Sequence, residues 1–256
     1  IDSASDCCTG SGSSLSSGVA KMPGAMVQTR MPHCARSRAS GSVMPEDNRQ
    51  SIARMLRHHG CWVLENDVYG ELSHEPSERR LRDLLDPERL LVFSTFEKLM
   101  GPEAPYGYLL SRALSMELQR TFLLRSFRLS PIRQKAIARL YSSGRIDQHL
   151  QVLRRLLCER KARMLQVLQE RLGDAMECIE PRGGAALWLR SLRPVDMRRV
   201  FQRMLKQSVV IAPGELFSLH GLHSQHVRLS HAFSGQHDID TAMGLLGDAL
   251  RLELID

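Results

Sequence analysis

A lysine that could act as an amine nucleophile follows one of the most apolar runs in the sequence. The run is Leu90–Phe93, and residues 94–98 after it read Ser-Thr-Phe-Glu-Lys. In an open α/β sheet, ligands bind at the carboxyl ends of the strands. A lysine held there on an apolar scaffold can attack a carbonyl carbon through its amine. Lys98 is therefore the first candidate for chemistry, and the alternative is an ordinary lysine in a solvated loop.

A second group of polar residues follows another apolar run, at residues 61–64. Residues 65–69 read Glu-Asn-Asp-Val-Tyr. Two acids, an amide and a phenol at the end of a strand can bind a polar ligand. The alternative is an Asx turn that leads the chain into a helix.

The third candidate is Arg228, which lies inside the run Val-Arg-Leu-Ser at 227–230. An arginine within an apolar strand either points to solvent or reaches into a cleft, where its fork can bind a carboxylate. Two further segments precede it. Residues 181–184, Pro-Arg-Gly-Gly, favour a tight turn, and residues 209–217 read Val-Val-Ile-Ala-Pro-Gly-Glu-Leu-Phe.

Histidines and cysteines give weaker signals. The histidines at 220, 223 and 226 are spaced by three, and His231 follows them, but Gly221 and the strand pattern after it argue against a helix. We therefore interpret them as surface histidines and not as metal ligands. The 6 cysteines are scattered without a C-x-x-C pair, which predicts reduced thiols.

These candidates lie on elements that alternate in the first 112 residues and change character afterwards. Alternating strands and helices predict parallel strands joined by crossover helices, followed by an α+β unit. Strands are expected at 25–29, 61–64, 90–93, 108–110, 175–180, 185–190, 208–212 and 225–230. Helices are expected from Pro45 to Gly60, around 78–85, and at 112–126, 130–142, 146–172, 195–206 and 238–253.

Composition bounds the possible classes. The chain has 256 residues, of which 43% are hydrophobic and 25% charged, so collagen, coiled-coil and wholly disordered chains are excluded. A net charge of +7 permits contact with anions without showing it. No apolar run approaches the roughly 18 residues of a membrane helix, and residues 1–24 are Ser/Gly-rich and unlike a signal peptide. We expect a cytoplasmic protein whose residues 1–24 are disordered, and the initial Ile suggests a piece of a longer chain.

The order of these motifs resembles a known family. Asn-Asp-Val-Tyr-Gly-Glu-Leu is followed by Ser-Thr-Phe-Glu-Lys-Leu-Met-Gly-Pro, Tyr-Gly-Tyr, Pro-x-Gly-Gly-x-x-x-Trp-Leu, Ile-Ala-Pro-Gly-x-x-Phe and Val-Arg-Leu-Ser. This resembles the fold type I pyridoxal-phosphate (PLP) aminotransferases, and most closely the aminotransferase-like domain of MocR-type regulators in the GntR family. The resemblance implies an α/β fold. Residues 25–112 would be the C-terminal part of a large domain with a mostly parallel sheet, and 113–256 the connecting helices and a small α+β domain.

The resemblance also implies roles for individual residues. Lys98 matches the lysine that forms a Schiff base with PLP, and Thr95 matches a hydroxyl that binds the cofactor phosphate. Tyr69 matches the tyrosine that binds the cofactor 3-oxygen, and Arg228 the arginine that holds the substrate carboxylate. Asn66 occupies the place of the aspartate that pairs with the ring nitrogen of the cofactor.

Several departures from the family pattern predict a degraded cofactor site. Asn66 lacks the charge of the expected aspartate, Pro105 stands where the family has a phosphate-binding arginine, and Arg38 stands at the place of an asparagine. Nothing resembles the upstream half of the large domain. Each charge-assisted contact contributes ~1.5–3 kcal/mol, so two or three losses weaken binding by orders of magnitude.

Three functions follow from these observations. The first is the PLP-binding-type effector domain of a MocR-like transcription regulator, with an amino acid or an amine as ligand. The alternative is a PLP-dependent aminotransferase that acts on an amino acid and a 2-oxo acid through Lys98, and the third is a non-functional truncated remnant. The resemblance further implies a homodimer that binds DNA only through a helix-turn-helix domain outside these residues and has no membrane partner.

Overall fold

The computed structural model describes residues 44–73, 79–127, 129–178, 180–181, 183–218, 220–232 and 238–254. The expected strand at 25–29, the Ser/Gly-rich segment 1–24 and Arg38 lie outside this part of the chain. Two compact units form. The first holds Pro45–Glu71 and Pro76–Val152, and the second holds Leu72–Glu75 and Leu153–Asp256.

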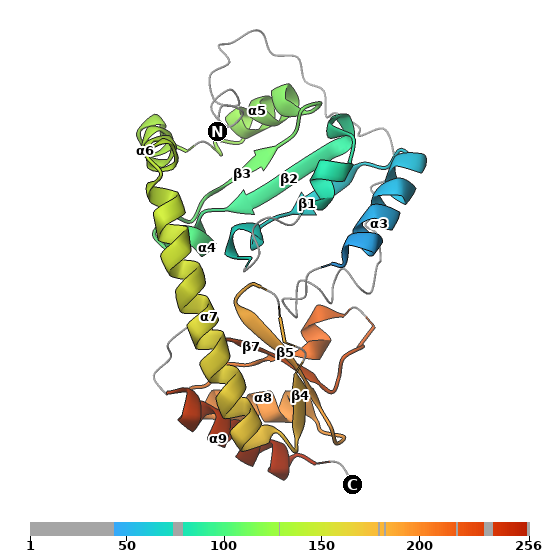
Figure 1. Cartoon of the computed structure of the whole chain (residues 1–256), viewed down its shortest axis with the longest axis vertical. Coiled ribbons are helices and arrows are strands. Elements are labelled where there is room, and N and C mark those ends of the chain that lie inside the picture. The colour runs from blue at the N-terminus through green and yellow to red at the C-terminus, as the bar shows by residue number, and fades with distance from the viewer. Residues whose placement is uncertain are drawn as a thin grey trace. The chain divides into compact units, whose positions relative to one another are not determined.

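The first unit is built on a three-stranded sheet in the order β1-β2-β3 (Figure 1). Its strands are β1 (Val63–Asn66), β2 (Leu90–Thr95) and β3 (Gly107–Leu110). β1 and β2 run parallel as expected, whereas β3 runs antiparallel to β2. The prediction of parallel strands is therefore wrong for β3. The link after β2 holds only the short helix α4 (Glu97–Met100), and parallel strands need a crossover of a dozen or more residues.

The segments before β2 differ from the sequence prediction in detail. α3 (Glu46–His58) forms as expected, with Ala53 and Leu56 buried and Gly60 in the left-handed region at φ 57°. β1 begins two residues later than predicted. Of the helix expected around 78–85, the described residues form only the 3-10 turn η2 (Leu81–Leu84), which lies between the 3-10 turns η1 (Gly70–Leu72) and η3 (Pro87–Arg89). Leu85, directly after η2, is already extended.

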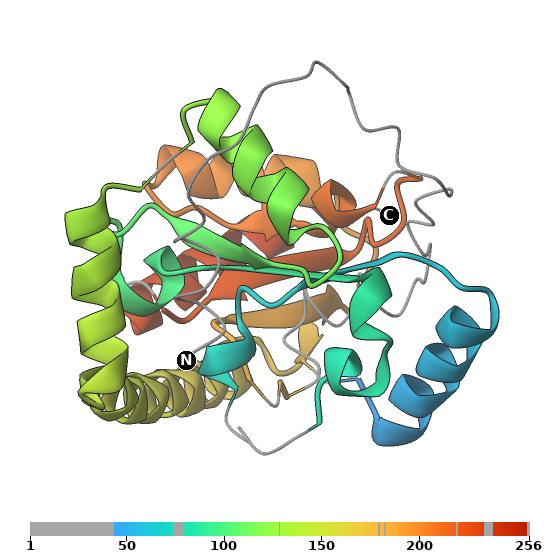
Figure 2. The same ribbon diagram turned by 90° about the horizontal axis from the view of Figure 1, so that it is seen from above.

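Three helices follow β3, close to their predicted bounds. They are α5 (Ser115–Leu124), α6 (Pro131–Ser142) and α7 (Arg145–Leu172). Figures 1 and 2 together show that α6 and α7 meet at a sharp bend, where Gly144 has φ 70°. Neither α5 nor α6 has a buried residue. Several large apolar side chains there are exposed, namely Met116, Leu123, Leu124, Phe127 and Ile132.

The second unit is a four-stranded antiparallel sheet in the order β4-β5-β7-β6. Its strands are β4 (Met176–Cys178), β5 (Ala186–Ser191), β6 (Ala212–Pro213) and β7 (His226–Ser230). Its helices are α8 (Met197–Lys206) and α9 (Ile239–Leu252), and η4 (Gly214–Phe217) follows β6. Side chains of α7, α8, α9, β5 and β7 form its apolar core. The strand expected at 208–212 is wrong up to residue 211; Val210 is exposed, and only Ala212 and Pro213 pair with β7.

Within the described residues, no helix combines the length and apolar character that a membrane span requires.

Candidate functional site

The carboxyl ends of β1 and β2 bring two of the candidate residues onto one face of the first sheet. Asn66 lies opposite Phe93 in the parallel register, and Thr95 lies two residues further along β2. Alternate residues of a strand share a face, so Asn66, Phe93 and Thr95 point the same way. The neighbours Asp67 and Ser94 point to the opposite face.

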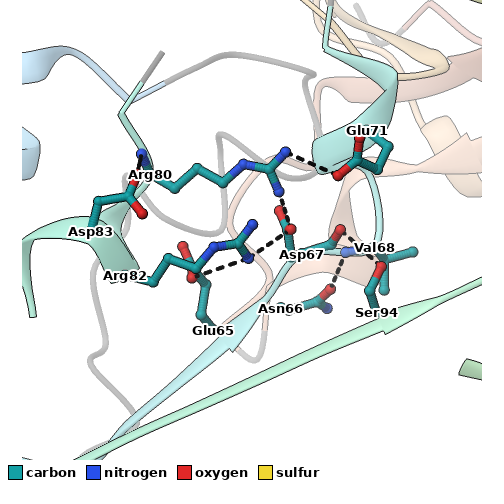
Figure 3. Close-up of polar contacts among 9 residues, drawn as sticks. All are labelled: Glu65, Asn66, Asp67, Val68, Glu71, Arg80, Arg82, Asp83 and Ser94. Carbon is teal, nitrogen blue, oxygen red and sulfur yellow. Dashed lines mark hydrogen bonds and ion pairs between the residues drawn. The ribbon is translucent and has the colours of Figure 1, made fainter. Parts of the chain in front are cut away.

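The side chain of Asn66 forms the Asx turn that local sequence allowed. The backbone N–H of Val68 donates to Oδ1 of Asn66 at 3.1 Å, as Figure 3 shows. This bond uses the acceptor atom of the amide. The other end, Nδ2, carries two N–H donors that remain for other partners. Asn66 therefore presents a neutral hydrogen-bond donor at the end of β1.

Asp67 is committed to an ion-pair network on the other face (Figure 3). Its side chain is 9% exposed, and Oδ2 accepts from Nη1 of Arg80 and, at 2.8 Å, from Nη1 of Arg82. Its backbone is tied to β2, because its N–H donates to the Phe93 carbonyl at 2.8 Å and its carbonyl accepts from Ser94 Oγ at 3.1 Å. The acid beside Asn66 thus has its charge and its backbone fully engaged.

Burial raises the pKa of three titratable groups in the first unit. Burial raises the pKa of Glu65, the nearby Asp67 charge adds to this effect, and Arg82, at 3.7 Å from Oε2, opposes it. Burial also raises the pKa of Tyr108, which pairs with Ser94 across β2 and β3, and the pKa of Tyr141 to about 12. Low-dielectric surroundings disfavour the charged form of both residue types.

Lys98 and Thr95 lie at the turn from β2 into α4. Thr95 Oγ1 accepts from the Glu97 N–H at 3.2 Å and donates to the Tyr106 carbonyl at 3.3 Å. The Lys98 side chain is 39% exposed, and its Nζ pairs with Glu97 Oε1 at 3.2 Å. Pro105, which takes the place of the expected arginine, is exposed. Thr95 therefore already uses its hydroxyl in holding α4, whereas the Lys98 amine forms an exposed ion pair with the adjacent Glu97, a kind of contact that contributes little stability.

Tyr69 lies half-buried in the turn that leaves β1. The Gly70 N–H donates to the Asp67 carbonyl at 3.0 Å, which closes the turn around Tyr69. A side chain at Gly70 would collide with the Asp67 carboxylate. The absence of a side chain at Gly70 therefore leaves room for the Asp67 carboxylate.

In the second unit, Arg228 is half-buried on β7 opposite Trp188 on β5. Its guanidinium carbon lies 6.0 Å from the centre of the Phe217 ring. Arg228 Nε and Trp188 Nε1 are buried and lack a hydrogen-bond partner within the described part of the chain. Directly paired residues of antiparallel strands share a face, so these two donors lie on the same side of the sheet.

The interpretation of the histidines as surface residues is wrong for His231, which is 2% exposed. His223 and His226 are half-buried and pack on the Trp188 ring, with centroid distances of 5.6 and 5.4 Å. The reason is that the chain stays bonded to its neighbour directly after β7, where the His231 N–H donates to the Ala185 carbonyl at 3.1 Å. The described residues contain no group of three or more metal-ligating side chains.

Sequence reasoning missed Arg80 and Arg82. They are 23% and 25% exposed and come from residues next to and within η2, where a helix was expected. The feature of the sequence that could have pointed to them is the charged segment Arg-Arg-Leu-Arg-Asp at 79–83, which follows the acids Glu65 and Asp67 along the chain. Nothing in the sequence, however, placed these arginines against Asp67 rather than in solvent.

Comparisons with known proteins find HTH-type regulators among the relatives of this chain. The chain is 26% identical over 214 residues to the uncharacterised HTH-type transcriptional regulator YisV of Bacillus subtilis, covering 83% of this chain and 44% of that protein. It is 28% identical over 216 residues to the uncharacterised HTH-type regulator YdcR of Escherichia coli, covering 83% and 46%. The chain thus spans about half the length of the curated relatives it matches.

The fold matches solved aminotransferases. Pyrococcus horikoshii kynurenine aminotransferase superposes with a TM-score of 0.76 at 22% identity, covering 85% of this chain and 54% of that one. The family model for class I and II aminotransferases matches residues 25–245, which include both sheets and the segments that carry Asn66, Lys98 and Arg228. This chain therefore belongs to the class I and II aminotransferase family.

Proposed function

We propose that the chain is the PLP-binding-type effector domain of a MocR-like transcription regulator, which senses an amino acid or an amine and does not turn it over. DNA binding would belong to a helix-turn-helix domain outside these residues. The HTH-type regulators among the relatives support this proposal. Support from the molecule itself comes from the contacts of Asn66.

The described residues fit one side of PLP. Asn66 would meet the ring nitrogen, Tyr69 the 3-oxygen, and Lys98 would supply the amine for covalent attachment of the cofactor. When bound with a protonated ring nitrogen, PLP acts as an electron sink for amino-acid chemistry. Asn66 and Thr95 share a face of the sheet, which supports this assignment.

The polarity of Asn66 carries the choice of a sensor over an enzyme. Its Oδ1 already accepts from Val68 N–H, so the amide meets a ligand with N–H donors. A donor stabilises an unprotonated ring nitrogen, whereas a carboxylate holds the protonated one. Asp67 does not replace it, because its carboxylate is held by two arginines on the opposite face. The cofactor would therefore be bound with little power to withdraw electrons.

The residues that would hold the phosphate of PLP offer fewer contacts than those that would meet its ring. Pro105 has no side-chain donor, and the hydroxyl of Thr95 is engaged with Glu97 and Tyr106. Fixed orientation supplies much of the advantage of a bound lysine over a free amine, so a poorly anchored phosphate lowers the affinity. We expect weak PLP binding by this chain.

Arg228 would bind the carboxylate of the sensed ligand. Its buried Nε and the Nε1 of Trp188 are donors without a partner among the described residues, and buried donors are rarely left unpaired. An acceptor such as a carboxylate would satisfy them. This supports an amino acid over a simple amine as the ligand.

An absorbance titration with PLP tests the proposal. The native chain should develop a weak visible band that Lys98→Ala abolishes and the control Lys206→Ala, at an exposed position on α8, retains. Addition of amino acids and 2-oxo acids should give no turnover. A strong Lys98-dependent band with turnover would favour the aminotransferase alternative, and the absence of any Lys98-dependent band would favour the remnant.

A further inference from the structure

The segment after β1 leaves the first unit and returns to it within ten residues. Glu71 belongs to the first unit, whereas Leu72 and Ser73 belong to the second, where Ser73 forms a β-bridge with Gly183. Arg80 is back in the first unit. Asn66, at the end of β1, and Tyr69, in the turn after it, therefore lie shortly before residues that belong to the second unit.

Two arginines hold this strand end in place. Arg80 contacts Asp67 through Nη1 and Glu71 Oε1 through Nη2 at 3.3 Å. It therefore links the point where the chain returns to the first unit with the residues directly before the chain leaves it. Arg82 contacts the same Asp67 oxygen at 2.8 Å and Glu65 Oε2 at 3.7 Å. Charge-assisted contacts to a largely buried carboxylate are stronger and more directional than neutral hydrogen bonds.

The position of Asp67 determines the position of Asn66. The N–H that fixes the Asn66 amide belongs to Val68, the residue directly after Asp67. Any rotation of Asp67 out of its contacts with Arg80, Arg82, Phe93 and Ser94 would move that N–H and release Oδ1. The amide of Asn66 could then turn and present an acceptor instead of a donor.

We propose that Asp67, clasped by Arg80 and Arg82, is a positioning residue that fixes the Asn66 amide with its N–H donors toward the bound ligand. The inference rests on the proposed function only in naming PLP as that ligand. It accounts for a buried acid with two arginine partners beside the site. If these contacts served only to link residue 71 with residue 80, the pair of Glu71 with Arg80 would be enough, and Asp67 would not need a second arginine.

The sequence offers a direct test, because its only asparagines are Asn48 and Asn66. Asparagine labelled with ¹⁵N gives two side-chain amide signals, and Asn48, exposed on α3, is the internal reference. In the native chain without cofactor, we expect the Oδ1 bond to Val68 to fix the Asn66 amide, so that its Nδ2 signal is displaced from the random-coil position at which Asn48 gives its signal. PLP should shift the Asn66 signal and leave the Asn48 signal in place.

Asp67→Ser removes the clasped carboxylate without adding an asparagine, and Glu71→Gln is the matched control that removes the other partner of Arg80. We expect the Asn66 signal to lose most of its displacement from the random-coil position in Asp67→Ser and to keep it in Glu71→Gln. Arg82→Gln, which keeps the acid, should lose part of the displacement, and this variant provides the test if Asp67→Ser does not fold.

The outcomes separate the two proposals. An Asn66 signal at the same position in the native chain and in the Asp67 and Arg82 variants, or one that moves as much in Glu71→Gln, would overturn the positioning role. A native Asn66 signal that is ordered but unmoved by PLP would contradict the proposed function alone. A PLP-dependent shift in the native chain that is lost in Asp67→Ser at unchanged circular dichroism supports both.

Discussion

Asn66 and Asp67 are sequence neighbours with opposite surroundings. The strand alternation puts the amide toward the candidate site and the acid toward two guanidinium groups. This alternation is the reason why Asp67 does not replace the expected acid. The sequence did not show what Asp67 binds, because the arginines come from a separate turn.

Asn66→Asp should strengthen PLP binding and introduce reactivity toward amino acids. A carboxylate at this position would hold the ring nitrogen in its protonated form, and a charge-assisted contact contributes ~1.5–3 kcal/mol, roughly tenfold to a hundredfold in affinity. PLP titration and a change of the visible spectrum on addition of amino acid measure the effect. Asn48→Asp is the control, and equal affinities of native chain and Asn66→Asp would refute the assignment of Asn66 to the ring nitrogen.

The thiol of Cys178 should react slowly with alkylating reagents. Burial raises its pKa from the ordinary 9.0 to about 11, so at pH 8 the reactive thiolate is about 100-fold less populated than in the unfolded chain. Alkylation with iodoacetamide, followed by mass spectrometry, should label Cys178 far more slowly in buffer than in urea. Equal rates in the two solvents would contradict this expectation.

At the scale of elements, the sequence predicted most helices and missed several local arrangements. Long periodic segments such as α7 and α9 were predictable because their apolar faces and caps are encoded locally. The antiparallel direction of β3 and the shortened β6 depend on pairing partners far along the chain, and the segment expected as a helix at 78–85 holds Arg80 and Arg82 against Asp67. The three-residue spacing of the histidines likewise gave no sign that His231 is buried.

α8 depends on a local cap. Asp196 accepts hydrogen bonds from the backbone N–H groups of Arg198 at 3.0 Å and Arg199 at 3.2 Å. Asp196→Ala should lower the free energy of unfolding by about 1–2 kcal/mol, the usual cost of losing such a cap. Urea denaturation measures it, with the exposed Asp174→Ala as the control. Equal losses in both variants would mean that the cap does not stabilise the helix.

The free energy of unfolding should depend on pH through Glu65, which lies on β1. Its pKa in the folded chain is raised above the ordinary 4.5, so the folded state holds the proton more tightly than the unfolded state does. The resulting stabilisation is complete below pH 4.5 and is lost as the pH rises through the folded pKa. Glu65→Gln should remove this decline in urea unfolding between pH 4 and 7, and Glu88→Gln, at an exposed position, should retain it.

At the scale of the whole molecule, the exposed helices α5 and α6 suit the homodimer implied by the family. Leu124 on α5 and Ile132 on α6 are 60% and 81% exposed, and large apolar side chains left in solvent favour burial at an interface. The double variant Leu124→Glu with Ile132→Glu should therefore shift the chain toward the monomer in sedimentation velocity. Val210→Glu, at a similarly exposed site on the second unit, is the control; a native chain that is already monomeric would contradict the proposed assembly.

The brief passage of the chain through the second unit at Leu72 and Ser73 makes both units discontinuous in the gene. A single crossover between two related genes near codon 152 would exchange most of the second unit while retaining the old residues 72 and 73. The bridge between Ser73 and Gly183 would then join segments of different ancestry. Relatives should therefore inherit the two units together, and hybrids should survive only where the segments around residues 73 and 183 come from one parent.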